Sequence, residues 1–252
     1  MKRALPIAIA LAMAGSAAAD PFKPSQGQQI ELGRRAAAEI RKEEKVLPAS
    51  DPRVQTLRRV GRRLLNRVDG SKEPWEYSFD VIESKELNAF ALPGGPVFFY
   101  TGLMDKMKTE DELAGVLSHE LTHVRREHWA YAYRDSQKRN LLLNLGLIFA
   151  KANRATADLA SIGSNLLFDL PFSRGHESQA DSQGFDLMVK AGYNPEGMAD
   201  VFELLRSESK GGNPPEFLSS HPDDKNRINR IREMAKKSGS NYPAMRPLSW
   251  AK

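Results

Sequence analysis

The chain contains no cysteine. This absence excludes disulfide bonds, thiolate metal ligands, a cysteine nucleophile and lipid attachment through a cysteine side chain. Any metal site must therefore be built from other side chains. If the chain is exported, the lack of cysteine suits a bacterial periplasm.

The chain also lacks a strong excess of charge of one sign. Its formal net charge is +5, and it falls to +3 without Lys2 and Arg3, which belong to an N-terminal targeting segment. An excess of this size is too small to argue for binding of nucleic acid. We therefore expect no nucleic-acid partner.

Long apolar runs are missing as well. Leu5–Ala14 is too short for a comfortable membrane span, and the alanines at 17–19 fit signal-peptide cleavage. We expect residues 1–19 to be a signal peptide for export to a bacterial periplasm; the alternative is a retained anchor. Leu141–Phe149 and Leu166–Phe172 are apolar but also short. We expect them in the core, the alternative being a lid or a membrane-facing surface.

The most informative pattern that is present is HExxH, at His119, Glu120 and His123. Residues four apart lie one turn apart on the same face of an α-helix, so two imidazoles at this spacing can share one zinc ion. Glu120 projects beside them, where it can accept a proton from water. The alternative is a buried helix whose histidines only form hydrogen bonds, which this spacing makes less favoured.

The flanking residues indicate that this segment is helical. Thr109 and Glu112 form a possible capping box at its start. Acidic residues at 110–112 and the basic residues Arg125, Arg126 and His128 complement the helix dipole. Apolar residues cover much of the helix surface: Leu113, Val116, Leu117, Leu121 and Val124. We therefore expect a buried helix.

Two helices and three strands are predicted before this segment. Apolar residues near helical spacing favour helices over 26–45 and 52–68. Alternating residues predict a strand over 75–83, and 88–92 and 97–100 read as two more strands. The last two strands form either an ordinary hairpin or an edge strand beside a cleft, and such an edge strand would bind an extended peptide by strand addition. The two interpretations are compatible. The candidate substrate-binding residues are Asn88, Ala89, Phe90, Gly94 and Gly95.

Four arginines gather on one side of the second predicted helix: Arg58, Arg59, Arg62 and Arg63. They could meet anionic lipid headgroups, which would make peripheral membrane contact possible. We favour the simpler interpretation, a solvated face beside acidic neighbours.

A second group of candidate ligands is Glu177 and Asp181, again four residues apart in a helical pattern from Ser173 to Lys190. A zinc site with two histidines needs a third protein ligand, and a carboxylate suits it. Glu177 could be that ligand, and Asp181 could accept a hydrogen bond from the far ring nitrogen of a ligand histidine. His176 is a rival ligand that we expect to point elsewhere. The alternative is two solvated acids on a surface helix.

Taken together, four ordered motifs resemble family forty-eight of the metallopeptidases, of the HtpX, BepA and Oma type. They are the runs at 88–95 and 100–102, HELTH at 119–123, SRGHESQAD at 173–181, and SSHP at 219–222 with Arg227 following. The resemblance covers nearly all of the chain after residue 19. HtpX-type members have transmembrane helices and BepA-type members have C-terminal helical repeats, and the sequence predicts neither here.

The resemblance implies an α+β, mostly helical gluzincin fold, with a small antiparallel sheet beside the zinc cleft. It implies a single zinc metallopeptidase domain over residues 20–252. It also implies one zinc ion per chain, bound by His119, His123 and Glu177, with Glu120 as the catalytic base.

His221 precedes Pro222, which suits the first turn of a predicted helix over 222–237, and it follows a run rich in glycine and proline that predicts a loop. A capping or surface histidine is the simpler interpretation. With the family pattern, we expect His221 to face the zinc cleft. There it would either donate a hydrogen bond to the oxyanion of the reaction or occupy the open zinc position as a gate.

These expectations converge on a zinc-dependent endopeptidase with protein or peptide substrates. Misfolded or unassembled cell-envelope proteins are the substrates that the resemblance implies. The competing hypothesis is a chaperone or adaptor in which zinc is only a structural staple. The sequence identifies no partner protein.

Overall fold

The computed structural model describes residues 20–68, 73–149, 172–209, 214–222, 226–239 and 241–250, and only the backbone of residues 140–149. The predicted signal peptide lies outside these ranges. So do the side chains of the apolar run at 141–149 and most of the run at 166–172. No helix in the described ranges combines the length and the apolar character needed to cross a bilayer.

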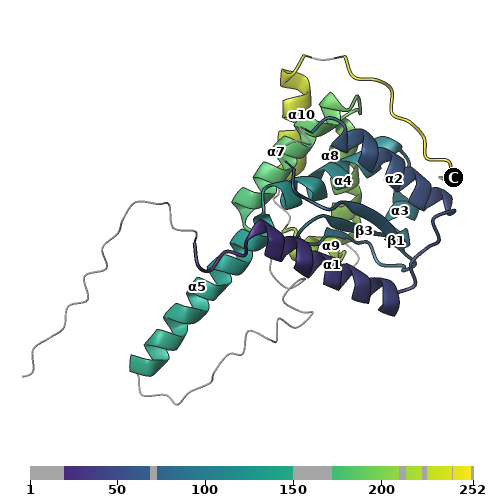
Figure 1. The fold of residues 1–252 in the computed structure, drawn as a ribbon. Helices are drawn as coiled ribbons and strands as arrows, with labels where there is room; N and C mark the ends of the chain where they lie inside the picture. The colour runs from purple at the N-terminus through teal and green to yellow at the C-terminus, as the bar shows by residue number, and fades with distance from the viewer. Residues whose placement is uncertain are drawn as a thin grey trace, which may run out of the picture.

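Helices surround one small sheet, which confirms the mostly helical α+β class (Figure 1). The strands are β1 (Ser78–Ile82), β2 (Ala89–Ala91) and β3 (Pro96–Tyr100). The helices are α1 (Gln26–Glu43), α2 (Pro52–Leu65), α3 (Thr101–Lys106), α4 (Glu110–Arg125), α5 (His128–Phe149), α7 (Arg174–Lys190), α8 (Glu196–Glu208), α9 (Phe217–Ser220) and α10 (Arg227–Lys237).

The sheet is mixed, and not antiparallel throughout as predicted. Its strand order is β1-β3-β2. β2 and β3 form the expected antiparallel pair, but β1 runs parallel to β3, with Ser78 opposite Pro96 and Ile82 opposite Tyr100. Side chains alternate with a period of two in both kinds of pairing, so the sequence pattern did not distinguish them. One consequence is that β2 lies at an edge of the sheet.

The sheet separates two layers of helices. On one face, Phe98 of β3 packs with Ala37 of α1, and Figure 1 shows α1 lying across this face. On the other face, Val97 and Phe99 join the main core, to which α2 and α4 contribute. Successive residues of β3 thus point into two different cores, as the alternation of a strand requires.

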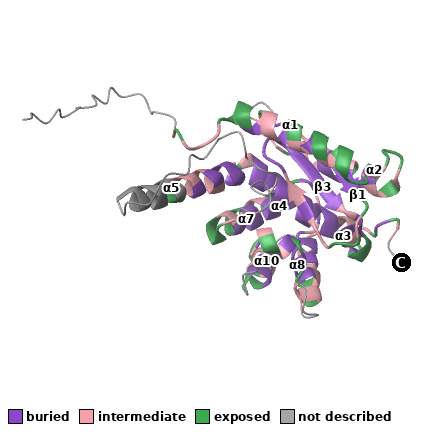
Figure 2. Ribbon diagram, turned by 90° about the horizontal axis from the view of Figure 1, so that it is seen from below, coloured by how far each residue is buried: buried purple, intermediate pink, exposed green. Residues whose placement is uncertain are grey.

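α4 is the central helix and is buried from Asp111 to Val124 (Figure 2). Its predicted capping box is present. The Thr109 hydroxyl accepts the Glu112 N–H at 3.2 Å, and the Glu112 carboxylate accepts the Thr109 N–H at 2.8 Å. These bonds satisfy donors that the first turn would otherwise leave unpaired, so the start of the helix is fixed.

A glycine allows α7 to approach α4 closely. A Cβ added at Gly184 of α7 would lie 3.2 Å from the backbone nitrogen of His119 and 3.0 Å from the Met198 side chain. Such distances are tighter than ordinary van der Waals contact, so a larger residue would push α7 away. The absence of a side chain at Gly184 therefore brings the candidate ligands of the two helices within reach of one another.

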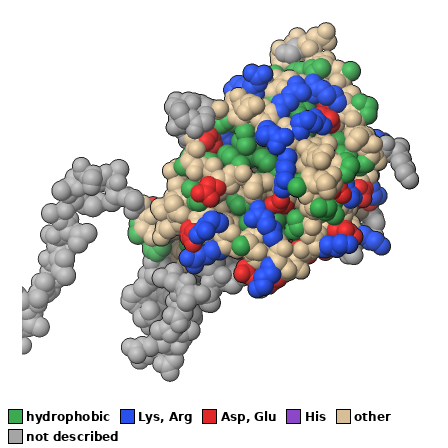
Figure 3. Space-filling model, turned by 45° about the vertical axis from the view of Figure 1, so that its right-hand side comes forward, with side chains coloured by type: hydrophobic (Ala, Val, Ile, Leu, Met, Phe, Trp, Pro, Cys, Tyr) green, Lys and Arg blue, Asp and Glu red, His purple; other side chains and the backbone are tan. Residues whose placement is uncertain are grey.

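The arginines of α2 mostly bond within the protein. Arg58 donates to Asp80 at 3.0 Å, Arg59 to Glu110 at 2.6 Å, and Arg63 to the carbonyl of Ala191 at 2.7 Å. On the face shown in Figure 3, basic side chains lie among acidic and apolar ones. These contacts fit the favoured interpretation of arginines beside acidic neighbours, and peripheral membrane contact stays a prediction.

The chain around His221 differs from the expectation. A short helix, α9, interrupts the predicted loop, and His221 is its C-cap residue. α10 begins at Arg227, so the predicted helix start at Pro222 is wrong. A proline permits a helix start but does not require one, and the start that follows a proline here is that of α9, where the carbonyl of Pro215 accepts the Leu218 N–H at 2.9 Å.

Candidate metal centre

α4 and α7 bring three candidate ligands together at the centre of the molecule. His119 and His123 belong to α4, and Glu177 belongs to α7. The Nε2 atoms of the two histidines lie 3.0 Å apart. Glu177 Oε1 is 3.3 Å from Nε2 of His123, and its Oε2 is 3.6 Å from Nε2 of His119. The structure thus brings together the three residues that the sequence offered as zinc ligands.

His221 joins this group from the end of α9. Its Nδ1 lies 3.1 Å from Glu177 Oε1 and 3.2 Å from His119 Nε2. Its Nε2 lies 3.3 Å from Glu120 Oε1. The ring is 1% exposed, so His221 is not a surface residue and lies between the candidate ligands and the candidate base.

The residues His119, His123, Glu177 and His221 fit a zinc ion. All four are buried, and one ligand atom from each lies within 4.8 Å of the others. Ligand atoms of a tetrahedral zinc site with bonds of about 2 Å lie about 3.3 Å apart, which is close to the distances measured between neighbours. Among the residues that the structure describes, no second group of this kind occurs.

The protonation of these side chains also suits a cation. Burial lowers the pKa of both His119 and His123 well below the usual histidine value, so both rings are neutral and offer a lone pair. Burial would raise the pKa of Glu177, but the neighbouring His221, His119 and His123 together outweigh burial, and the pKa of Glu177 falls well below its usual range. Two neutral imidazoles and a carboxylate are the forms that bind a metal.

Glu120 is buried beside the group and is held by the sheet. Its Oε2 accepts the backbone N–H of Ala91 at 2.9 Å. Burial raises the pKa of Glu120 to about 7. A carboxylate with a pKa near neutrality can both accept and return a proton. The bond to Ala91, which the sequence did not reveal, ties the candidate base to the edge strand β2.

Asp181 lies behind His119, where we expected a partner for a ligand histidine. Its Oδ1 is 3.1 Å from His119 Nδ1. The same oxygen accepts the Nη2–H of Arg227 at 2.6 Å, and Arg227 Nη1 lies 3.1 Å from Glu177 Oε2. Arg227 of α10 therefore contacts both Glu177 and Asp181 of α7 from a position that is 2% exposed. Its place in the family pattern was the only signal for it in the sequence.

Phe172, the last residue of the apolar run at 166–172, which we expected in the core or in a lid, is a further residue of the site. Its ring centroid lies 4.0 Å from that of His123 and 5.3 Å from that of His221. Its N–H donates to the carbonyl of Ser220 at 3.2 Å. Phe172 therefore covers the group and connects the segment before α7 to α9.

His176 does not belong to the ligand group, as expected. Its ring stacks on His128, with centroids 4.4 Å apart and planes 12° apart. His128 lies between His176 and the site, because its Nδ1 is 3.1 Å from Nδ1 of His123. Burial lowers the pKa of His128 to about 4, so this ring is neutral. The only role that we expected for His128 from the sequence was a charge that complements the helix dipole.

The edge strand β2 runs beside Glu120. The carbonyl of Asn88 and the N–H of Leu92 bond to β3, whereas the N–H of Ala91 points away from β3 to Glu120. Backbone groups alternate in direction along a strand, so those of Ala89 point the same way as those of Ala91. This places the outward row of backbone groups next to the candidate metal site, with the N–H of Ala91 bonded to Glu120 and Ala89 buried.

The predicted residues Gly94 and Gly95 lie elsewhere, against α1 and Glu76. Both have positive φ, 86° and 130°. A Cβ at Gly94 would lie 2.5 Å from Ile30 Cα, and one at Gly95 would lie 2.6 Å from the Glu76 carbonyl oxygen. Close packing within the protein thus explains both glycines, and their contact with substrate stays a prediction.

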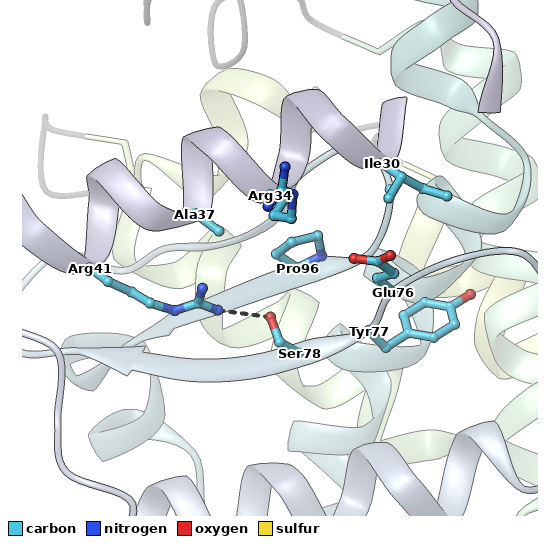
Figure 4. A pocket seen from close by; sticks show the side chains of 9 residues that line it. Ile30, Arg34, Ala37, Arg41, Glu76, Tyr77, Ser78 and Pro96 are labelled. Atoms are coloured by element: carbon cyan, nitrogen blue, oxygen red, sulfur yellow. Dashed lines mark hydrogen bonds between the residues drawn. The ribbon is translucent and has the colours of Figure 1, made fainter. Parts of the chain in front are cut away.

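A surface pocket of about 300 Å³ beside these glycines does not include the candidate ligands (Figure 4). Within it, Arg41 donates to Ser78 Oγ at 2.9 Å. The pocket is lined by Ile30, Arg34, Ala37, Arg41, Glu76, Tyr77, Ser78, Gly94 and Pro96. It lies between α1 and β1, so it is separate from the metal centre.

Comparison with known proteins agrees with this geometry. The model of peptidase family M48 matches residues 51–235, a range that contains all four residues of the group. The chain is 29% identical to the beta-barrel assembly-enhancing protease of Escherichia coli O157:H7, over 86% of this chain and 47% of that protein. It is 33% identical to the mitochondrial metalloendopeptidase OMA1 of Schizosaccharomyces pombe, over 75% of this chain and 55% of that protein.

A third relative is matched over most of its own length. Metalloprotease LoiP of Escherichia coli strain K12 is 28% identical, over 91% of this chain and 89% of that protein. By contrast, the chain spans about half the length of the beta-barrel assembly-enhancing protease.

Proposed function

Because the chain belongs to peptidase family M48, we propose that it is a zinc-dependent endopeptidase. The observation that carries this proposal is the convergence of His119, His123 and Glu177 beside the buried carboxylate of Glu120. A metal held only for structure needs no base at its side, whereas peptide hydrolysis does.

His119, His123 and Glu177 would hold one zinc ion. The chemistry that zinc supplies in such a site is polarisation of the scissile carbonyl and a lower pKa for the attacking water. Asp181 and Arg227 position these ligands. The contact from Asp181 Oδ1 to His119 Nδ1, at 3.1 Å, directs Nε2 of His119 toward Glu177 and His123.

Glu120 is proposed as the general base. It would take a proton from the water that attacks the carbonyl carbon and pass that proton to the nitrogen of the leaving amine. The carbon–nitrogen bond then breaks, giving a carboxylate and an amine without an acyl-enzyme. The pKa of Glu120, which burial raises to about 7, supports both halves of this transfer.

The substrate is proposed to bind as an added strand along β2. The outward backbone groups of Ala89 and the side chain of Phe90 lie at this edge, next to Asn88. An extended peptide pairing with this edge would pass its backbone beside Glu120, because Ala91 contacts that carboxylate. Main-chain pairing also explains how one site could act on many sequences.

His221 is proposed as the gate of the site. Its Nδ1 is as close to Glu177 as the Nε2 of His123 is, at 3.1 Å against 3.3 Å. An imidazole in that position fills the place that water or a carbonyl needs. Donation to the oxyanion is the alternative, and it requires the ring to leave Glu177.

The substrates are proposed to be misfolded or unassembled proteins of the cell envelope, reached after export to a periplasm. This rests on the predicted signal peptide at 1–19 and on relatives whose names include a beta-barrel assembly-enhancing protease. The second candidate function is a chaperone or adaptor with a structural zinc ion. Burial of the four candidate ligands is compatible with a structural zinc ion. This second function would be favoured if Glu120 proved dispensable.

The test is to measure metal content and casein digestion for the wild type and Glu120→Gln. We expect one zinc ion in both proteins and cleavage by the wild type alone, with a loss of at least about 100-fold for the variant, the lower end of the range for a positioned base. Equal cleavage by both proteins would exclude this mechanism. Zinc in both with cleavage in neither would support the chaperone or adaptor.

A further inference from the structure

A chain of three side chains, the first two of them buried, leads away from the metal centre behind His123. The Nδ1 of His123 lies 3.1 Å from the Nδ1 of His128. The Nε2 of His128 lies 2.8 Å from Oε1 of Gln179. His123 and His128 are 3% and 1% exposed, so water does not compete for the bond between the two rings.

The positions of the protons in this chain follow from chemistry. The Nε2 of His123 faces His119 and Glu177 and must be free of a proton to bind a metal. The neutral ring then carries its proton on Nδ1, which needs an acceptor. His128 Nδ1 is that acceptor, so the proton of His128 lies on Nε2 and is donated to Gln179 Oε1.

We propose that His128, oriented by Gln179, is a positioning residue that fixes the tautomer and ring orientation of His123 for metal binding. This inference rests on the metal site of the proposed function, although it does not require that the protein cleave peptides. The partner of a ligand histidine is most often a carboxylate, a carbonyl or water. Here a second neutral histidine takes that place, while Asp181 does so for His119.

The turn between α4 and α5 determines the position of His128. Glu127, between α4 and α5, has a positive φ of 54°, which is uncommon for a residue with a side chain. Its carboxylate accepts a hydrogen bond from Gln29 at 2.7 Å and pairs with Lys23 at 2.9 Å. This turn directs the first residue of α5 back onto His123. The ring of His176 then covers the other side of His128.

Zinc affinity, measured by competition with a chelator, tests the acceptor. His128→Leu and His128→Asn are matched, because both shorten the side chain to the same size but only asparagine keeps an acceptor at the position of Nδ1. We expect His128→Leu to lose about 10- to 100-fold in affinity, as for other outer partners of zinc ligands, and His128→Asn to lose clearly less. His176→Phe, which keeps the stacked ring, should bind zinc like the wild type.

The tautomers can be read directly by long-range proton–nitrogen NMR, because the chain has only five histidines. In the zinc-loaded wild type we expect the proton of His128 on Nε2 and that of His123 on Nδ1. The proposal is overturned if the His128 proton lies on Nδ1, or if the folded leucine and asparagine variants bind zinc equally well.

A variant at an exposed position tests the same chain of contacts with little risk of unfolding the protein. Gln179 is exposed, so Gln179→Leu should fold, and we expect a smaller loss of zinc affinity in the same direction. Unchanged affinity there, with His128 still protonated on Nε2, would remove Gln179 from the proposal. Failure of the wild type to bind zinc would instead contradict the proposed function.

Discussion

The fold supports the two sides of the metal centre very differently. His119, His123 and Glu177 project from α4 and α7, helices of 16 and 17 residues with side-chain caps at their starts. His221 ends α9, a helix of four residues without a side-chain cap. A helix so short gains little stability of its own, so its place depends on contacts with other elements.

The contacts around the two sides differ in the same way. Behind the α4 and α7 side lie charged and hydrogen-bonded partners, such as the pair of Arg227 with Asp181. On the α9 side, a backbone bond from Phe172 to Ser220 and ring contacts with Phe172 and Phe217 hold His221. The comparison therefore predicts that the first side binds the metal and that the second side controls access to it.

The largest effect should come from the first side. Glu177→Ala removes one of three ligands, so we expect zinc affinity to fall by more than about 100-fold, beyond the range for outer partners, and peptidase activity to be lost with it. Zinc content after dialysis and the chelator titration measure this. Ser178→Ala, at the exposed neighbouring position of α7, is the control. Full zinc occupancy in the glutamate variant would mean that another side chain is the third ligand.

His221→Ala tests the second side. If His221 is a gate that is closed in about nine of ten molecules, its removal should raise turnover about 10-fold, with zinc retained and self-cleavage increased. Turnover on a peptide substrate, metal content and the pattern of autolysis products are the measurements. His176→Phe, which removes a histidine outside the ligand group and keeps the ring stacked on His128, should leave turnover unchanged.

Other outcomes of that experiment separate the remaining roles of His221. A fall in turnover of about 100-fold with zinc still bound would identify the ring as an oxyanion donor. A variant equal to the wild type in turnover, metal content and autolysis would exclude both roles. Loss of zinc as complete as in Glu177→Ala would contradict the comparison between the two sides.

The sequence was most informative where the structure depends on residues near one another in the chain. The helix that carries His119 and His123 was predicted because its capping box, its apolar surface and its ligand spacing all lie within α4. The helix that carries Glu177 was predicted for the same reason. The place of His221 depended on the family pattern, since its own surroundings predicted a different helix boundary.

What the sequence could not provide were contacts between distant segments. Arg227 meets Asp181 from another helix, 46 residues away, and although it shares a face of α10 with Ile231, its charge predicts an exposed side chain. The parallel pairing of β1 with β3 is likewise invisible in the alternation of either strand. The acceptor role of His128 depends on the turn at Glu127, where a residue that is not glycine adopts a positive φ.

The smallest effect should come from Phe172, whose substitution sharpens the comparison. Its ring lies against His123 on one side of the centre and against His221 on the other. If Phe172 mainly holds the α9 side in place, Phe172→Ala should raise turnover about threefold. This corresponds to a free-energy difference of about 0.6 kcal/mol, within the range of interaction energies between residues in contact. Zinc affinity should stay close to that of the wild type. A loss of zinc affinity would indicate instead that Phe172 mainly supports His123.

The double variant Phe172→Ala with His221→Ala decides between these possibilities. When His221 is absent, Phe172 has no gate to hold, so we expect its substitution to add nothing to the turnover of His221→Ala. Such non-additivity is the mark of residues that act as a unit. Phe172→Leu keeps an apolar side chain over the site and should have a smaller effect than alanine. Equal effects of Phe172→Ala with and without His221 would show that Phe172 acts independently of the histidine, and the ring would then belong to the α4 and α7 side of the centre.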